Sequence, residues 1–221
     1  MIAILQARLG STRLPGKGLF SFFGQHIVER AISIAQSAEH VDRVVLATGD
    51  RPENLAMQSY VANTGAEFLV GSEDDVLSRF CQALEGYDGE YCLRITCDNY
   101  LAQPAVIDGL FEAAKAENAD YAYIAPLSHF SGEIVRCDAL RECYAGDHSP
   151  EAKEHVTWDI RNSDVYKRLA LPSNFYGIEH QKRITLDTLE DLLTMKSLEA
   201  NYPELESIGC LESVQKLTQT L

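Results

Sequence analysis

A loop near the N-terminus combines glycine, hydroxyl and basic side chains in a pattern that suits an anionic ligand. It follows the apolar segment 2–6, and a helix-like stretch begins near residue 25. Although the chain has 33 acidic residues against 19 Lys+Arg, no Asp or Glu occurs before Glu29. A strand, a glycine-rich basic loop and a helix together hold phosphate groups in α/β proteins, because backbone N–H groups and the helix N-terminus face the anion. The candidate anion-binding residues are Arg8, Gly10, Ser11, Arg13 and Lys17.

The spacing of the glycines excludes two common phosphate loops. A Walker loop needs four residues between Gly and Gly-Lys, followed by Ser or Thr. Here five residues separate Gly10 from Gly16, and Gly18 follows Lys17. The Rossmann G-x-G-x-x-G pattern is also absent, because Ser21 stands where the third glycine would be.

Two aspartates come directly after apolar runs, where strands are expected to end. Asp98 closes the segment 94–98, and Asp187 closes the similar segment 183–187. Two carboxylates beside a triphosphate would suit Mg²⁺, which takes a few carboxylate oxygens together with phosphate oxygens and water. Such a metal would neutralise charge that builds on the α-phosphate and on departing pyrophosphate. Either Asp could instead be the N-cap of the helix that follows it, and Asp187 is well placed for that role.

The stretch Gln6–Lys17 resembles the signature of nucleotidyltransferases that form nucleotide sugars. It is most similar to the cytidylyltransferases that activate acidic sugars, and among these to the branch called spore-coat polysaccharide biosynthesis protein F. The likeness to acylneuraminate and 3-deoxy-manno-octulosonate cytidylyltransferases is more distant. Segments 71–79, 154–157 and 187–192 match the same family in the same order, and Asp98 matches its Gly-Asp element. The resemblance therefore spans nearly the whole chain.

The resemblance implies a reaction and a set of site residues. The reaction is transfer of CMP from CTP to an acidic sugar of the nonulosonic or octulosonic type, which gives a CMP-sugar and pyrophosphate for surface polysaccharide or glycan synthesis. The implied cofactor is Mg²⁺, held by Asp98 and Asp187. The implied catalytic residues are Arg13, Lys17, Asp98 and Asp187. The implied nucleotide-binding residues are Gln6, Ala7, Arg8, Gly10, Ser11, Arg13, Lys17, Gly71, Ser72, Asp74 and Arg79. The implied sugar-binding residues are Arg94, Glu133, Glu154 and His155.

The segment 71–79 also has an explanation that needs no ligand. Ser72 or Asp74 would serve as the N-cap of the following helix, whose dipole favours acids in the first turn. Arg79 could reach a phosphate, or it could pair with Asp75 four residues earlier. In the same way, His155 and the adjacent Glu154 would form an ordinary surface pair.

The chain departs from the family pattern around Asp98. Cys97 replaces the usual Gly, Tyr100 replaces Pro, and Gln103 stands where a further Asp is usual; Leu189 also replaces a Pro. These changes leave open a second interpretation, a nucleotide-binding subunit with weakened catalysis. A glycosyltransferase that consumes a nucleotide sugar is the other alternative, although such enzymes usually carry Asp-x-Asp and this chain has only one carboxylate there.

The pattern of apolar runs predicts an α/β fold. Expected strands are 2–6, 43–47, 67–70, 91–95, 120–124, 133–136, 165–171 and 183–186, and expected helices are 25–38, 53–63, 75–85, 104–117, 151–161 and 189–200. This alternation predicts a mostly parallel, Rossmann-like sheet flanked by helices, and the resemblance makes it a GT-A-like nucleotidyltransferase sheet. Residues 1–221 are expected to form a single domain with a small β/α insert at about 126–180 for sugar binding and dimerisation.

Composition limits the partners and the location. The net charge of −14 argues against nucleic acid, because neutralising phosphates requires a basic face. No apolar run reaches the roughly 18 residues of a membrane helix, and the short apolar start lacks the basic region of a signal peptide. The six cysteines form no C-x-x-C pair and are expected to be reduced thiols in the cytoplasm. The family resemblance implies a homodimer.

Overall fold

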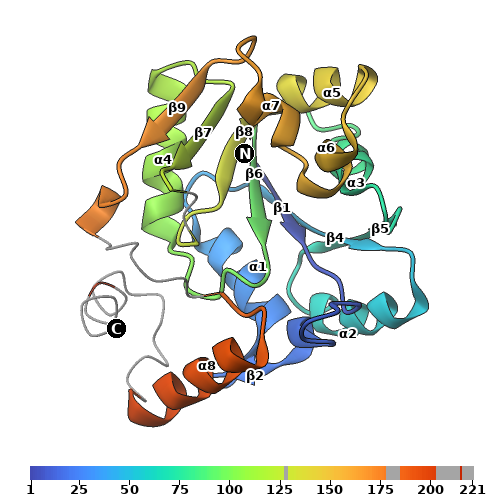
Figure 1. Ribbon diagram of the computed structural model, residues 1–221, viewed down its shortest axis with the longest axis vertical. Helices are drawn as coiled ribbons and strands as arrows, with labels where there is room; N and C mark the ends of the chain where they lie inside the picture. The colour runs from blue at the N-terminus through green and yellow to red at the C-terminus, as the bar shows by residue number, and fades with distance from the viewer. Residues whose placement is uncertain (127–128, 178–184, 203–214, 216–221) are drawn as a thin grey trace.

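A seven-stranded sheet runs through the molecule, with helices on both of its faces (Figure 1). The computed structural model describes residues 1–126, 129–177, 185–202 and 215. The strands of the sheet are β1 (Ile2–Gln6), β4 (Arg43–Gly49), β5 (Glu67–Gly71), β6 (Tyr91–Thr96), β7 (Tyr121–Ile124), β8 (Glu133–Arg136) and β9 (Arg168–Leu171). Their order is β5-β4-β1-β6-β8-β7-β9, and β8 alone among them is antiparallel to its neighbours. The predicted mostly parallel sheet is therefore confirmed.

The central strand β1 is apolar on both faces because both faces are covered. Ile2 and Ile4 belong to one hydrophobic core, whereas Ala3 and Leu5 belong to the other. This alternation follows from the period of two residues in a strand, and a continuous apolar run is typical of a buried parallel strand. Gln6 ends the run and is paired with Thr96 at the end of β6.

The helices divide between the two faces of the sheet. The α-helices are α1 (Ile27–Ser37), α2 (Gln58–Val61), α3 (Val76–Ala83), α4 (Pro104–Ala116), α5 (Cys137–Ala145), α6 (Pro150–His155), α7 (Trp158–Asn162) and α8 (Leu189–Asn201). Short 3₁₀ helices η1 (Lys17–Leu19), η2 (Pro52–Met57) and η3 (Phe175–Gly177) and a small hairpin of β2 (Ser21–Phe22) and β3 (Gln25–His26) lie between them. Helices α1, α4 and α8 pack in one core, and α3, α5, α6 and α7 pack in the other.

Several sequence-based boundaries were wrong. The helix expected over 151–161 is broken into α6 and α7 at Val156, whose φ of 49° cannot continue a helix. The helix expected over 53–63 begins as η2, and only α2 is α-helical. The strand expected over 165–171 begins at Arg168, and α5 was not predicted at all.

The last predicted strand, 183–186, falls partly outside the described residues, and residues 185–186 are not in a strand. Residues 126–180, predicted as an insert, contribute β8 and β9 to the main sheet. No helix in the described part of the chain is long and apolar enough to cross a membrane.

Candidate active site

The loop between β1 and η1 presents unused backbone donors. Within the described residues, the N–H groups of residues 10–13 donate to no protein acceptor. The ends of the loop are held firmly, because Leu9 N donates to Asn54 Oδ1 at 2.8 Å and Gly16 N donates to Leu9 O at 2.9 Å. Gly16 has a φ of 72°, a conformation that glycine adopts without strain. Asn54 was missed in the sequence because nothing local links it to this loop.

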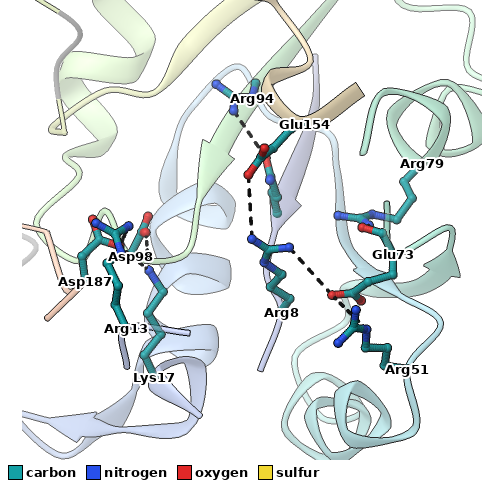
Figure 2. Close-up of polar contacts among 11 residues, drawn as sticks. Arg8, Arg13, Lys17, Arg51, Glu73, Arg79, Arg94, Asp98, Glu154 and Asp187 are labelled. Carbon is teal, nitrogen blue, oxygen red and sulfur yellow. Dashed lines mark hydrogen bonds and ion pairs between the residues drawn. The ribbon is translucent and has the colours of Figure 1, made fainter. Parts of the chain in front are cut away.

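Lys17 connects the basic loop to both predicted metal ligands (Figure 2). Its Nζ donates to Asp98 Oδ2 at 2.6 Å and to Asp187 Oδ1 at 2.8 Å. Arg13 adds an ion pair with Asp187 at 3.2 Å. The structure therefore brings together all four predicted catalytic residues, which come from two loops and a strand end far apart in the chain.

Three of these four charged side chains are largely buried, whereas Arg13 is exposed. The side chains of Lys17, Asp98 and Asp187 are 16%, 20% and 11% exposed. Burial by itself raises the pKa of Asp98, but the charge of Lys17 and hydrogen bonds from Lys17 and Thr96 hold that pKa below its ordinary value. Asp98 is therefore ionised at neutral pH.

The two carboxylates fit a divalent metal. They already converge on one cation, the ammonium of Lys17. No group of three or more His, Cys, Asp or Glu in the described part of the chain could hold a metal. The protein would thus supply two hard oxygen ligands and leave the other positions to phosphate and water, which suits Mg²⁺.

Asp187 is not the cap of α8. The N-cap is Thr188, whose hydroxyl accepts from Asp191 N, while the Asp191 carboxylate accepts from Thr188 N at 2.8 Å. The capping interpretation of Asp187 is therefore wrong by one residue. Its carboxylate faces the basic loop instead.

Three pockets form a continuous line across the carboxyl ends of the strands. The central pocket, of about 180 Å³, is lined by residues of the basic loop and by Asp98 and Asp187. It shares Thr96 and both aspartates with a second pocket of about 200 Å³. On its other side it shares Gln6 and Arg8 with a third pocket of about 150 Å³. Ligands commonly bind at this edge of a parallel sheet.

The third pocket lies under the loop that follows β5. Arg79 is 1% exposed there, and it donates to the carbonyls of Ser72 and Glu73. The expected caps were wrong, because Asp75 is the N-cap of α3 and Ser72 accepts from Asp75 N. Because Arg79 donates to these two carbonyls, it holds the conformation of the loop. Asp74 also lines this pocket.

Glu73, which sequence reasoning did not select, is the buried carboxylate of the third pocket. It accepts from Asn54 Nδ2 at 2.9 Å, and it lies 3.9 Å from Arg8 and 3.8 Å from Arg51 (Figure 2). The sequence analysis explained the acids of this segment by the helix dipole, and that explanation does not predict that Glu73 is buried. Arg8 also lies 3.9 Å from Glu154, so Arg8 is placed between two carboxylates.

A buried network supports the second pocket. Arg94 Nη1 donates to Glu133 Oε2 at 2.8 Å, and Arg94 Nη2 donates to Gln6 Oε1 at 3.4 Å. Tyr121 and Thr157 hydroxyls donate to Glu133 at 3.0 and 2.9 Å. Burial alone raises the pKa of Glu133, but Arg94 and the other donors lower it below its ordinary value. Antiparallel pairing of β6 with β8 places Arg94 opposite Glu133.

The backbone next to Glu133 requires a glycine at position 132. Its φ is +74°, and an added Cβ would lie 2.5 Å from the Arg94 carbonyl oxygen. We expect Gly132→Ala to reduce the free energy of unfolding by about 1–3 kcal/mol through strain, and by more where the contact forces β6 and β8 apart. Gly86→Ala is the matched control, since its φ is +69° and nothing lies within 4 Å. Equal losses in urea unfolding of the two variants would contradict the close-contact explanation.

The predicted sugar-binding residues separate into two groups. Arg94 and Glu133 line the second pocket. Glu154 instead lines the third pocket beside Arg8, and it is 63% exposed. His155 lines none of the three pockets and lies 6.0 Å from the Trp158 ring, measured between ring centroids.

The departures from the family pattern have structural explanations. Cys97 does not adopt a positive φ, and its N–H donates to Gln6 O at 3.1 Å. Tyr100 donates its hydroxyl to Phe22 O at 2.6 Å. Gln103 is fully buried at the start of α4 and donates to the carbonyls of residues 101 and 102. Asp98 and Asp187 converge on Lys17 with these residues in place.

The sheet and the line of pockets define a nucleotidyltransferase, and known proteins narrow the class. A cytidylyltransferase family model matches residues 2–220. Spore coat polysaccharide biosynthesis protein SpsF of Bacillus subtilis (strain 168) is 31% identical over 229 residues, which cover 99% of this chain and 94% of that protein. The chain therefore belongs to the cytidylyltransferase family, and the resemblance drawn from its motifs is confirmed.

Solved structures agree with this assignment at the level of the fold. A cytidylyltransferase from Leptospira borgpetersenii serovar Hardjo-bovis (strain JB197) has a TM-score of 0.85 at 20% identity and covers 99% of this chain and 94% of that one. A CMP:2-keto-3-deoxy-manno-octonic acid synthetase complexed with CTP has a TM-score of 0.68 at 16% identity and covers 90% of this chain and 98% of that one.

Proposed function

We propose that this cytidylyltransferase transfers CMP from CTP to a hydroxyl of an acidic sugar and releases pyrophosphate. The observation that carries the proposal is the line of three pockets, which meet at Asp98 and Asp187 on one side and at Arg8 on the other. A nucleotide needs adjoining spaces for base and phosphates, and an acceptor needs a space beside the α-phosphate. The family assignment supports CTP as the donor.

The proposed placement follows the chemistry of each pocket. The triphosphate would lie in the central pocket, where the backbone of Gly10 and Ser11 offers N–H groups and Arg13 and Lys17 offer charge. The base would lie in the third pocket, between Arg8 and the loop that Arg79 holds. The acceptor sugar would lie in the second pocket, beside Arg94 and Glu133.

The proposed chemistry is an in-line displacement. The acceptor hydroxyl gives its proton to water and attacks the α-phosphorus, the bond to the bridging oxygen breaks, and pyrophosphate leaves with that electron pair. Such transfer depends on positioning and on neutralising charge. When bound to Asp98 and Asp187, Mg²⁺ would supply charge neutralisation and lower the pKa of the attacking hydroxyl. Arg13 and Lys17 would hold the outer phosphates in line.

The decisive experiment measures pyrophosphate release with four nucleoside triphosphates and a panel of acidic sugars. We expect release with CTP and one of the nonulosonic or octulosonic acids, and none with CTP alone. Turnover with neutral hexoses only would contradict the proposed acidic acceptor, while the cytidylyltransferase assignment would stand. A nucleotide sugar consumed without pyrophosphate would instead support a glycosyltransferase.

The proposal of a working enzyme also predicts the result of restoring the family glycine. Because Cys97 is buried and has an ordinary backbone conformation, Cys97→Gly should not raise turnover. It should lower the free energy of unfolding by about 1–2 kcal/mol, since glycine adds chain entropy and leaves a small cavity. A large gain in pyrophosphate release would support the weakened-subunit interpretation.

We also propose that the chain works as a homodimer that pairs through residues 126–180 and forms one domain. Exposed apolar side chains within that range support the pairing, notably Trp158 at 39% and Val165 at 84% exposure. Analytical ultracentrifugation of the wild type and of Val165→Asp tests it. A wild-type monomer at micromolar concentration would contradict the pairing.

A further inference from the structure

The position of Lys17 has a consequence for how the metal and the nucleotide bind. Its ammonium lies between the two candidate metal ligands, 2.6 Å from Asp98 Oδ2 and 2.8 Å from Asp187 Oδ1 (Figure 2). Both distances are those of strong, charge-assisted hydrogen bonds. Lys17 therefore fills the space on which the two carboxylates converge.

Four charged side chains meet in this arrangement. Asp98 and Asp187 carry two negative charges, and Lys17 and Arg13 carry two positive charges that contact them. Arg13 is 59% exposed, whereas Lys17 is 16% exposed and bonds to both carboxylates. A metal ion that enters alone would have to displace a largely buried ammonium from both carboxylates. Separating buried charges from their partners is costly.

A triphosphate removes this obstacle. Lys17 begins η1 directly after the basic loop, and it lines the central pocket together with Ser11 and Arg13. A modest side-chain movement would therefore take its ammonium from the carboxylates to a phosphate in that pocket. Asp98 would then lose its contact with the ammonium, and Asp187 would keep its ion pair with Arg13. A divalent metal could take the place that the ammonium leaves between them. Each ligand thereby creates the conditions for the other.

We infer that Lys17 is an internal counter-cation, which competes with a divalent metal for Asp98 and Asp187 and so makes metal binding conditional on the nucleoside triphosphate. This inference rests on the proposed function, because it takes Asp98 and Asp187 as the metal ligands. Thermodynamic linkage requires the coupling to be reciprocal, so the metal strengthens triphosphate binding by the same factor.

The test measures Mn²⁺ binding by electron paramagnetic resonance and calorimetry, first without any nucleotide. The wild type should bind Mn²⁺ weakly at this site. Lys17→Met should bind it at least about tenfold more tightly, because it removes a unit charge close to both ligands. Lys17→Gln should show the same direction of change. Glutamine keeps a hydrogen-bond donor between the carboxylates, so this variant stays informative where Lys17→Met unfolds.

Two controls separate the local effect from a general one. Arg43→Met also removes one positive charge. Arg43 forms an ion pair with Glu67 at the amino ends of β4 and β5, away from the site, so this variant should bind Mn²⁺ like the wild type. Adding Asp187→Asn to Lys17→Met should abolish the gained site. Equal Mn²⁺ affinities in wild type and in both Lys17 variants would overturn the inference, and so would a gain that survives Asp187→Asn.

A second titration includes the α,β-methylene analogue of CTP, which the protein cannot cleave. The analogue should raise the Mn²⁺ affinity of the wild type more than that of Lys17→Met, since the variant has no ammonium to relocate. Equal enhancement would overturn the inference. Failure of the analogue to bind the wild type would overturn the proposed function instead, and the nucleotide-free titration would still decide the role of Lys17.

Discussion

Replacing Asp187 by Asn is expected to reduce metal-dependent pyrophosphate release on the order of a thousandfold or more, because the metal contributes several kcal/mol of charge stabilisation in such reactions. Asp98→Asn should have a similar effect. Both side chains lie in the central pocket and converge on one cation. An amide keeps the shape of the side chain and loses the charge that holds a divalent ion.

The matched control is Thr188→Ala. Thr188 caps α8 with its hydroxyl, so this change should lower the free energy of unfolding by about 1 kcal/mol. It should leave the metal dependence of turnover unchanged, because the carboxylate of Asp187 remains. Near-normal turnover of Asp187→Asn at ordinary Mg²⁺ concentrations would show that Asp187 is not a metal ligand, and the folded state of each variant is checked by circular dichroism.

The second large effect is expected for Lys17→Ala. Calorimetry with Mg²⁺ present should show a loss of about 1.5–3 kcal/mol in CTP binding, which is the range for a charge-assisted contact. Binding of CMP should change little, because CMP lacks the outer phosphates that Lys17 is proposed to contact. The loss should therefore appear as a change in the ratio of the two affinities.

Arg43→Ala serves as the control for this measurement. It removes a partly exposed cation that forms an ion pair with Glu67 at 2.6 Å and lines none of the three pockets. Both affinities should stay as in the wild type. If Lys17→Ala weakened CTP and CMP equally, Lys17 would act on the α-phosphate or through the fold, and the proposed contact with the outer phosphates would be wrong.

Local patterns in the sequence predicted most strands and helices. The motifs that resemble the cytidylyltransferase family predicted the reaction class. Apolar runs of four or five residues predicted β1, β4, β5, β6, β7 and β8 because side-chain period and burial are local properties. The two-residue strands β2 and β3 were not predicted. The glycine-rich basic loop and the two aspartates indicated phosphate and metal chemistry because those residue types have few other uses in that order. Failures came where a single backbone conformation intervened, as at Val156 between α6 and α7.

The tertiary structure decided which charges meet. Lys17 contacts Asp98 and Asp187 from 81 and 170 positions away in the sequence, and only the strand order and the returning chain bring them together. From the sequence, Glu73 was explained as an acid near a helix N-terminus, whereas in the structure it is buried and accepts a hydrogen bond from Asn54. By itself the sequence determined the chemistry that is available, because residue type and local spacing set it. Only the structure determined that Lys17 pairs with Asp98 and Asp187, because electrostatic partnership depends on distance in space and burial.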